Sequence, residues 1–198
     1  MPSPEEELVA RVRAGDEAAF TKLVAEHHKA LVRLARTFVG SEGTAEEVAQ
    51  ETWIAVLDGI GAFEERSSLK TWLFRILVNR ARTRAKKQGR EVPFDVDDDE
   101  AHPDDGRFSG AGFWTGGGPR PWGEADLHNK RVAAIVRREV ENLPEAQRAV
   151  VLMRDIEGLD AKEVCNVLGL QETHQRVLLH RGRARLRARI ETELGEKQ

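Results

Sequence analysis

The stretch Asp160–Arg189, DAKEVCNVLGLQETHQRVLLHRGRARLRAR, is the most informative part of this chain for its fold. Its first half predicts a short helix whose apolar face is made by Val164, Val167 and Leu168. Asp160 can cap this helix, and Glu163 stands three residues later, as in a capping box. Gly169 follows the last apolar residue, where a helix often ends in the left-handed conformation. The pattern therefore predicts a short helix followed by a tight turn.

The second half of this stretch predicts a longer and strongly basic helix. From Arg176 onward it has no acid before Glu191, and it carries Arg176, Arg181, Arg183, Arg185, Arg187 and Arg189. A short helix, a turn with glycine and a cationic second helix form the helix-turn-helix pattern, whose second helix enters the major groove of DNA. An ordinary helical hairpin with a solvated arginine face is the alternative. The agreement of cap, turn and charge favours DNA binding.

Charge is distributed unevenly along the chain. The 198 residues carry a net charge of −3, which is unexpected for a protein that binds nucleic acid. Lys70–Arg90 nevertheless holds many basic residues and no acid, whereas Glu91–Asp105 holds many acids and no Lys or Arg. The net charge of the whole chain thus hides two cationic segments, Lys70–Arg90 and the arginine-rich helix. Each of them can neutralise phosphates.

The N-terminal part predicts helices throughout, from Glu5 to about Gln88. Asp16 is predicted to cap a long amphipathic helix. Thr44 and Glu47 form a capping-box pattern and are predicted to open the next helix. The apolar residues of that helix are Val48, Ile54, Ala55 and Leu57, with Thr52 among them.

A loop and a long basic helix are predicted to follow. Gly59–Glu65 reads as the loop, and Ser67 or Ser68 is placed to cap a helix over residues 69–87. The side chains predicted to point inward are Trp72, Leu73, Ile76 and Leu77. The basic residues of this helix are predicted to face outward.

Residues 91–123 predict a flexible linker between two helical domains, at 5–90 and 124–194. The linker contains several prolines, the run Gly116–Gly118 and the acidic segment, a composition that cannot bury a core. A passive tether has no need of its aromatic residues, which are Phe108, Phe113, Trp114 and Trp122. They could dock on a partner or pack back on the domains, and the sequence leaves both open.

The sequence offers no catalytic constellation. Its histidines show no metal-ligand spacing with Cys165, which reads as a small core residue. The glycine run neither follows a strand nor opens a helix, so it predicts no phosphate loop. No apolar run approaches the length of a membrane span, and the N-terminus lacks the order of a signal peptide. We therefore expect no enzyme activity, no cofactor, no metal, no small-molecule substrate and a cytoplasmic location.

Two long segments resemble the extracytoplasmic-function (ECF) subfamily of bacterial RNA polymerase sigma factors. Residues 45–87, AEEVAQETWIAVLDGIGAFEERSSLKTWLFRILVNRARTRAKK, resemble region two of that family. Region four is matched by LPEAQRAVVLMRDIEGLDAKEVCNVLGL at 143–170 and LLHRGRARLR at 178–187. The resemblance implies an all-α protein that binds core RNA polymerase and promoter DNA and is held by an anti-sigma factor. A plain helix-turn-helix regulator and a polymerase-binding adaptor are the competing interpretations.

The resemblance places a polymerase-binding surface on the helix over residues 45–57. In the family this helix binds the clamp helices of the largest polymerase subunit. The residues carried over are Glu46, Glu47, Gln50, Glu51 and Trp53. Their acidic character would complement a basic clamp surface, although a solvated helix face is the simpler explanation of the acids alone.

The resemblance also implies how the −10 promoter element is read. The family's loop matching residues 59–68 captures a base flipped out of the non-template strand. Phe63 offers a stacking surface there or plugs the core, and Trp72 reads as core first and DNA wedge second. The residues carried over for the −10 element are Phe63, Lys70, Trp72, Arg75, Asn79, Arg80, Arg82 and Arg84. Asn79 is the best candidate for contacting a base edge.

Recognition of the −35 element falls on the basic helix of the helix-turn-helix. The residues carried over are Thr173, Arg176, Val177, Leu178, His180, Arg181 and Arg183. The chain departs from the family at the start of this helix, where Gln175 occupies a position that commonly holds an inward Val. Val177 and Leu178 stand where polar contacts are common, so individual base contacts are not assigned.

The acidic linker would thread the polymerase cleft or act as a solvated tether.

Overall fold

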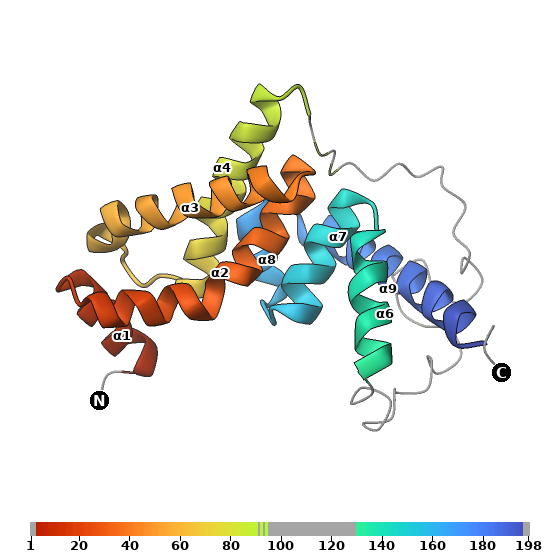
Figure 1. Ribbon diagram of the computed structural model, residues 1–198, viewed down its shortest axis with the longest axis horizontal. Coiled ribbons are helices and arrows are strands. Elements are labelled where there is room, and N and C mark those ends of the chain that lie inside the picture. Colours follow the sequence, from red (N-terminus) through yellow and green to blue (C-terminus); the bar gives the residue numbers. More distant parts are fainter. Residues whose placement is uncertain (1–2, 91, 93, 95–129, 196–198) are drawn as a thin grey trace. The chain divides into compact units, whose positions relative to one another are not determined.

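The computed structural model describes residues 3–90, 92, 94 and 130–195, which form helices and no strands. The N-terminal elements are α1 (Pro4–Arg13), α2 (Glu17–Val39), α3 (Glu42–Gly59), η1 (Ile60–Ala62) and α4 (Leu69–Lys87). They are followed by α6 (Lys130–Glu141), α7 (Glu145–Val151), η2 (Leu152–Ile156), α8 (Ala161–Leu168) and α9 (Glu172–Gly195). Two compact units result, α1–α4 with α8, and α6, α7 and α9 (Figure 1). The predicted all-α class is confirmed for these residues, whereas most of the predicted linker lies outside them.

Side-chain caps define where the N-terminal helices begin. Asp16 accepts a hydrogen bond from the backbone N–H of Ala19 at 3.0 Å, and Ser68 caps α4 in the same way, as predicted. The predicted capping box at Thr44 is wrong, because α3 begins three residues earlier, at Glu42, with Ser41 as its cap. The Ser41 hydroxyl accepts from the Thr44 N–H at 3.2 Å. Hydrogen bonding at Ser41 therefore allows Glu42 and Gly43 to join the helix.

The core of the first unit lies where α2, α3 and α4 pack against one another (Figure 1). Its largest fully buried side chains include Phe38, Leu23, Leu31, Leu34, Val48, Val56, Leu73, Phe74 and Leu77. Burying one such side chain stabilises a fold by about 1.5–3 kcal/mol. The resulting core holds the outer faces of α3 and α4 in fixed positions.

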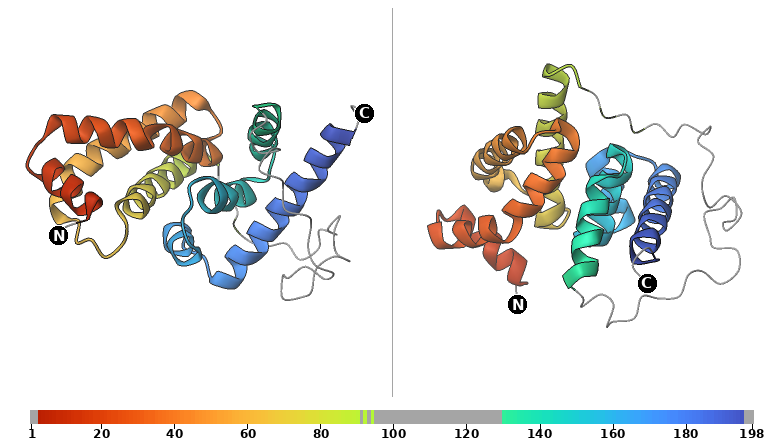
Figure 2. Two further views of the ribbon diagram at one scale, coloured as in Figure 1. Left: turned by 90° about the horizontal axis from the view of Figure 1, so that it is seen from below. Right: turned by 45° about the vertical axis from the view of Figure 1, so that its right-hand side comes forward.

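In the second unit, α9 packs on α7 at a glycine. A Cβ atom at Gly182 would lie 2.7 Å from Cγ2 of Val151 and 3.5 Å from Cβ of Gln147. Real Cβ contacts are not this short, so the absence of a side chain at Gly182 allows the two helices to approach. α6 also packs along α9 in this unit (Figure 2).

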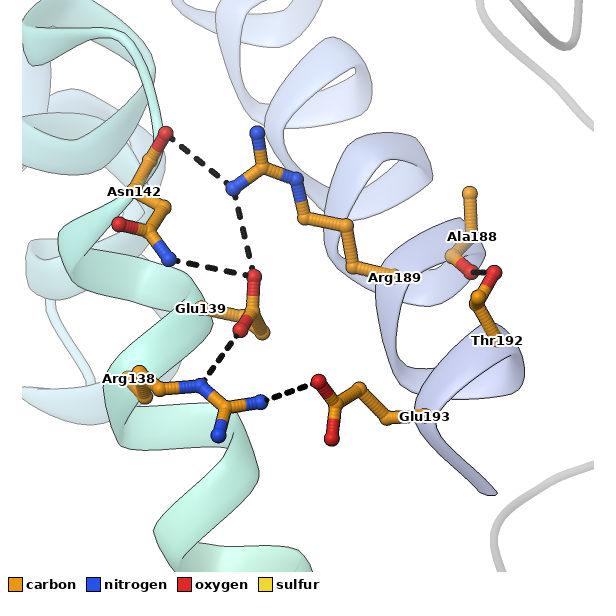
Figure 3. Close-up of polar contacts among 7 residues, drawn as sticks. All are labelled: Arg138, Glu139, Asn142, Ala188, Arg189, Thr192 and Glu193. Carbon is orange, nitrogen blue, oxygen red and sulfur yellow. Dashed lines mark hydrogen bonds and ion pairs between the residues drawn. The ribbon is translucent and has the colours of Figure 1, made fainter. Parts of the chain in front are cut away.

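A network of charged groups joins α6 to α9 (Figure 3). Glu139 is 6% exposed, and its carboxylate accepts hydrogen bonds from Arg138 at 2.9 Å and Arg189 at 3.3 Å. The side-chain amide of Asn142 donates to it at 3.4 Å, and Arg138 also pairs with Glu193 at 2.7 Å. The hydrogen bond from Arg138 lowers the pKa of Glu139, with smaller contributions from Asn142 and Arg189. Glu139 therefore stabilises this unit as an anion.

Replacing Glu139 by Gln is expected to lower the free energy of unfolding by about 1–2 kcal/mol at neutral pH, since hydrogen bonds to a charged group are lost. Because folding lowers the Glu139 pKa, its contribution is present above the unfolded value of about 4.3 and is lost as the pH falls through the folded value. Urea unfolding of both proteins between neutral and acidic pH measures the difference. The matched change Glu191→Gln removes a largely exposed carboxylate that pairs with Arg187, and it should have little effect. A difference between Glu139→Gln and the parent that does not shrink in acid would contradict this role.

Candidate nucleic-acid and protein interfaces

One face of α3 is exposed along most of its length. Glu47, Gln50, Ile54 and Leu57 recur at helical spacing, so their side chains share one face of the helix. Ile54 is 61% exposed and Leu57 is 50% exposed, so two large aliphatic side chains lie together on this exposed face. We call these four residues the α3 stripe, which is polar at its N-terminal end and apolar at its C-terminal end.

Two predicted polymerase-binding residues face α2 instead. Trp53 is 7% exposed, and its ring packs edge-on against Phe20 with centroids 5.8 Å apart. The Trp53 indole N–H donates to Nδ1 of His28 at 3.1 Å, and His28 Nε2 lies 2.8 Å from a carboxylate oxygen of Glu46. An indole can only donate, so Nδ1 of His28 accepts and Nε2 carries the proton donated to Glu46. The prediction of a surface role for Trp53 is therefore corrected, because its side chain is used in the core.

The acidic side of α3 and the basic side of α4 meet in ion pairs. A guanidinium nitrogen of Arg84 lies 2.7 Å from Glu51 and 3.3 Å from Glu47, and Arg80 lies 3.8 Å from Glu51. All four side chains are partly exposed, so each pair contributes only about 0–1 kcal/mol. Such pairs can be exchanged for phosphate or protein contacts at little cost.

The remaining predicted residues of α4 divide by exposure. Arg75 and Asn79 are exposed, and Asn79 lines a groove between α3 and α4. Lys70 is partly exposed, with its ammonium 5.9 Å from the centre of the Phe74 ring. Arg82 differs from the prediction: it is half-buried and its guanidinium lies over the ring of Phe38, 5.9 Å from its centre. Burial lowers the Arg82 pKa, as expected for a charge in the helix interface.

The loop before α4 forms one wall of a hollow. Ala62, Phe63 and Arg66 line it from the loop, and Trp72 lines it from α4. Phe63 is buried, and its ring centre lies 4.9 Å from that of Trp72. Of the two alternatives for Phe63, burial favours the core, so its direct stacking on a base is not supported. Trp72 is only partly buried, and it presents the accessible aromatic surface.

The N-terminal half of α9 has a clear outer face. The exposed side chains Thr173, Arg176 and Val177 lie at helical spacing from the partly exposed His180. Leu178 is buried, so its predicted role as a DNA contact is wrong. Gln175 is buried as well, as expected from its position in place of an inward Val. The buried side chains at the start of α9 thus recur at helical spacing, although Gln175 among them is polar.

Two further arginines of α9 have different surroundings. Arg181 is partly exposed. Arg183 is exposed, but its guanidinium donates two hydrogen bonds to the Asp155 carboxylate, at 3.0 and 2.5 Å. The hydrogen bonds to Asp155 raise the Arg183 pKa. A DNA phosphate would have to compete with Asp155 for this side chain.

Other kinds of site were sought in the part of the chain that the structure describes. No group of three or more His, Cys, Asp or Glu side chains is placed to hold a metal ion there. Among the described helices, none is long and apolar enough to cross a membrane.

Comparisons with known proteins place both units in one family. The Sigma-70 region 2 family model matches residues 23–91, and the Sigma-70 region 4 family model matches residues 133–186. A structure of CnrH in complex with the cytosolic domain of CnrY is similar with a TM-score of 0.56 at 25% identity, covering 99% of this chain and 100% of that one. The sigma factor RpoE of Bartonella quintana, in complex with the anti-sigma factor NepR, shares the fold with a TM-score of 0.54 at 23% identity, covering 90% of this chain and 98% of that one.

Sequence similarity identifies the subfamily. The chain is 32% identical over 164 residues to the ECF RNA polymerase sigma-E factor of Salmonella typhimurium, and the match covers 81% of each protein. Together with the matches to region 2 and region 4, this identity shows that the chain belongs to the ECF sigma factors, which bind core RNA polymerase and direct it to promoters.

Proposed function

We propose that the α3 stripe is the surface through which this sigma factor binds core RNA polymerase. The observation that carries the proposal is the exposure of Ile54 and Leu57 beside the polar residues Glu47 and Gln50. Exposed apolar side chains beside polar and charged ones are typical of protein interfaces, and the acids would steer the approach to a basic partner. Glu51 flanks the stripe and adds to its negative charge, and the Glu46 carboxylate, hydrogen-bonded to His28 on its α2 side, stays partly exposed beside it.

The −10 element would be bound by α4 and the hollow beside it. Phosphates would be contacted by Lys70, Arg75, Arg80 and Arg84, and Asn79 would reach a base edge from the adjoining groove. An unstacked base would enter the hollow and lie against Trp72, because aromatic surfaces bind extruded bases of any kind. Phe63 would support Trp72 from behind. Stabilising an extruded base favours strand separation, which is the step that a polymerase needs for initiation.

The −35 element would be bound by the outer face of α9. Thr173, Arg176, Val177 and His180 present polar, cationic and apolar groups on one face, as a recognition helix in the major groove requires. Arg181 and Arg183 would contact the flanking phosphates, Arg183 after release from Asp155. RNA synthesis itself would be left to the polymerase.

Regulation by an anti-sigma factor follows from the same surfaces. The solved relative RpoE was found with the anti-sigma factor NepR. We propose that this chain is held in the cytoplasm by a protein that covers its polymerase-binding face.

Transcription with purified components tests the proposed function. Core polymerase, this chain and a library of genomic promoter fragments are combined, and the 5′ ends of the transcripts are sequenced. Specific start sites that share −10 and −35 sequences and need both proteins are expected. A chain that binds DNA fragments but gives no start sites with core polymerase would be a helix-turn-helix regulator instead.

Replacing Arg176 by Ala is expected to weaken binding of −35 duplexes and to reduce the salt dependence of binding by about one phosphate contact. Arg176 is exposed on the outer face of α9 and can reach the DNA backbone without breaking a core contact. If it reads a guanine instead, one base position should lose about 1–3 kcal/mol of discrimination. Binding titrations at several salt concentrations, over single-base variants of the −35 element, separate the two. Equal affinity of variant and parent for all duplexes would place Arg176 outside the interface.

A further inference from the structure

Arg13, the last residue of α1, holds the loop that forms the wall of the hollow. Its Nε–H donates to the carbonyl oxygen of Ile60 at 3.0 Å, and one Nη donates to the carbonyl oxygen of Phe63. The other Nη lies 2.9 Å from the carboxylate of Glu65. Each nitrogen of the guanidinium therefore has an acceptor in the same short loop, about fifty residues away along the chain.

The contacted part of the loop has an irregular backbone. Ile60–Ala62 form a single turn of 3-10 helix, closed by a hydrogen bond of 3.3 Å from the Phe63 N–H to the Ile60 carbonyl. Glu65 has a φ of 57°, in the left-handed region that residues other than glycine rarely adopt. A backbone of this kind needs contacts from outside to keep one conformation. Arg13 supplies them on both sides of Phe63.

The position of Phe63 decides the shape of the hollow. Its buried ring lies against Trp72, which offers the aromatic surface in the hollow. Arg13 does not line the hollow itself, because it contacts the loop backbone from the α1 side. The hydrogen bond from Arg13 holds the backbone of Phe63 in place, and the backbone positions the Phe63 ring. The Phe63 ring in turn packs against Trp72 and supports its position in the hollow.

We propose that Arg13 is a positioning residue for base capture at the −10 element, an inference that rests on the proposed role of the hollow. Arg13 lies before the region 2 match, which begins at residue 23, so the family match assigns it no role. By holding the Ile60–Glu65 loop, Arg13 keeps the hollow shaped for an extruded base before DNA arrives. Preorganisation of this kind increases the affinity for DNA. A loop that is already ordered loses no conformational entropy when the base binds.

The geometry requires Arg at this position rather than any cation. A Lys ammonium is a single point on a flexible stem, and it could keep the ion pair with Glu65. It could not also donate to the carbonyl oxygens of Ile60 and Phe63, which the planar guanidinium reaches with two separate N–H groups. Arg13→Lys should therefore show most of the defect of Arg13→Gln although it keeps the charge.

The test measures capture of single bases by the holoenzyme. Single-stranded oligonucleotides carry the non-template −10 sequence of a promoter that the wild-type holoenzyme uses, each with one base replaced by an abasic site. At the captured position the abasic site should weaken wild-type binding at least about fivefold, since stacking on an aromatic side chain is lost. For Arg13→Gln and Arg13→Lys this penalty should fall below about twofold. Binding of core polymerase and of −35 duplexes should stay at wild-type levels in both variants, which a general folding defect would not allow.

Arg11→Gln is the matched control. Arg11 is on the same helix and its change removes the same charge, but its Nε–H donates to Asp16 at 2.8 Å and not to the loop. The proposal is overturned if the Arg13 variants keep the full abasic penalty, or if Arg11→Gln loses it equally. It is also overturned if the wild-type holoenzyme shows no penalty at any position. All three results leave the sigma function intact, because that function fails only if the wild-type chain does not start transcription with core polymerase.

Discussion

Replacing Ile54 and Leu57 together by Ser is expected to weaken the binding of core RNA polymerase about 100-fold. Apolar side chains that anchor an interface contribute about 1–2 kcal/mol each or more when they become buried. Both side chains are exposed in the free protein, so each substitution should change the free energy of unfolding by less than about 0.5 kcal/mol. Titration of labelled protein with core polymerase measures the first quantity, and urea unfolding measures the second.

Ile156→Ser is the matched control for this prediction. Ile156 is also an exposed aliphatic residue, at 40%, but it belongs to the second unit and lies outside the α3 stripe. Its change should leave polymerase binding within about twofold of the parent, as expected of a surface substitution away from the contact. If the double variant binds polymerase as tightly as the parent, the apolar end of the stripe is not the contact.

A variant that tests the charged end of the stripe is better made as Glu47→Gln than as Glu47→Lys. A lysine at this position would lie beside Arg84 and repel it.

Replacing Gly182 by Val is expected to destabilise the second unit by about 2–3 kcal/mol, because overpacking forces neighbouring helices apart. The new Cβ would lie 2.7 Å from a methyl group of Val151, which is itself buried. α9 would have to move away from α7, and the outer face of α9 would move with it. Both thermal unfolding of this unit and its affinity for −35 duplexes should therefore be reduced.

Ala188→Val separates overpacking from helix propensity. Ala188 is exposed on the same helix, so the change introduces the same β-branched side chain without a close neighbour in the core. It should cost less than about 0.7 kcal/mol. An unfolding midpoint for Gly182→Val equal to that of Ala188→Val would show that α7 and α9 do not need to approach at this glycine.

Local signals in the sequence predicted the helices well. The caps at Asp16 and Ser68 and the left-handed Gly169 are short-range features, set by groups within a few residues, and the structure has all of them. The start of α3 was misplaced because Ser41 and Thr44 are both acceptable caps, and in the structure Ser41 is the residue whose side chain accepts the capping hydrogen bond. The linker prediction and the domain boundaries within residues 95–129 lie outside the described residues.

Positions on the site surfaces were harder to predict, because they depend on residues far apart in the chain. The apolar residues of α3 surround the helix, and only packing on α2 and α4 shows that Trp53 is buried while Ile54 and Leu57 are exposed. Likewise, α4 alternates arginines, and the sequence does not reveal that Arg82 lies over Phe38 while Arg84 pairs with Glu51. Arg13 carried no motif at all, and its role depends on loop carbonyls that only a folded structure brings close.

We propose that this chain opens promoter DNA as a subunit of RNA polymerase, with binding through the α3 stripe and base capture beside Trp72. Permanganate reactivity of unpaired thymines on a promoter used in transcription measures opening directly. Reactive thymines in the −10 region are expected with core polymerase and this chain together, and not with either alone. The Ile54 and Leu57 double variant should abolish this reactivity at protein concentrations that saturate the parent. Opening by the chain without polymerase would show that it does not act as a polymerase subunit, and undiminished opening by the double variant would exclude the α3 stripe as the polymerase contact.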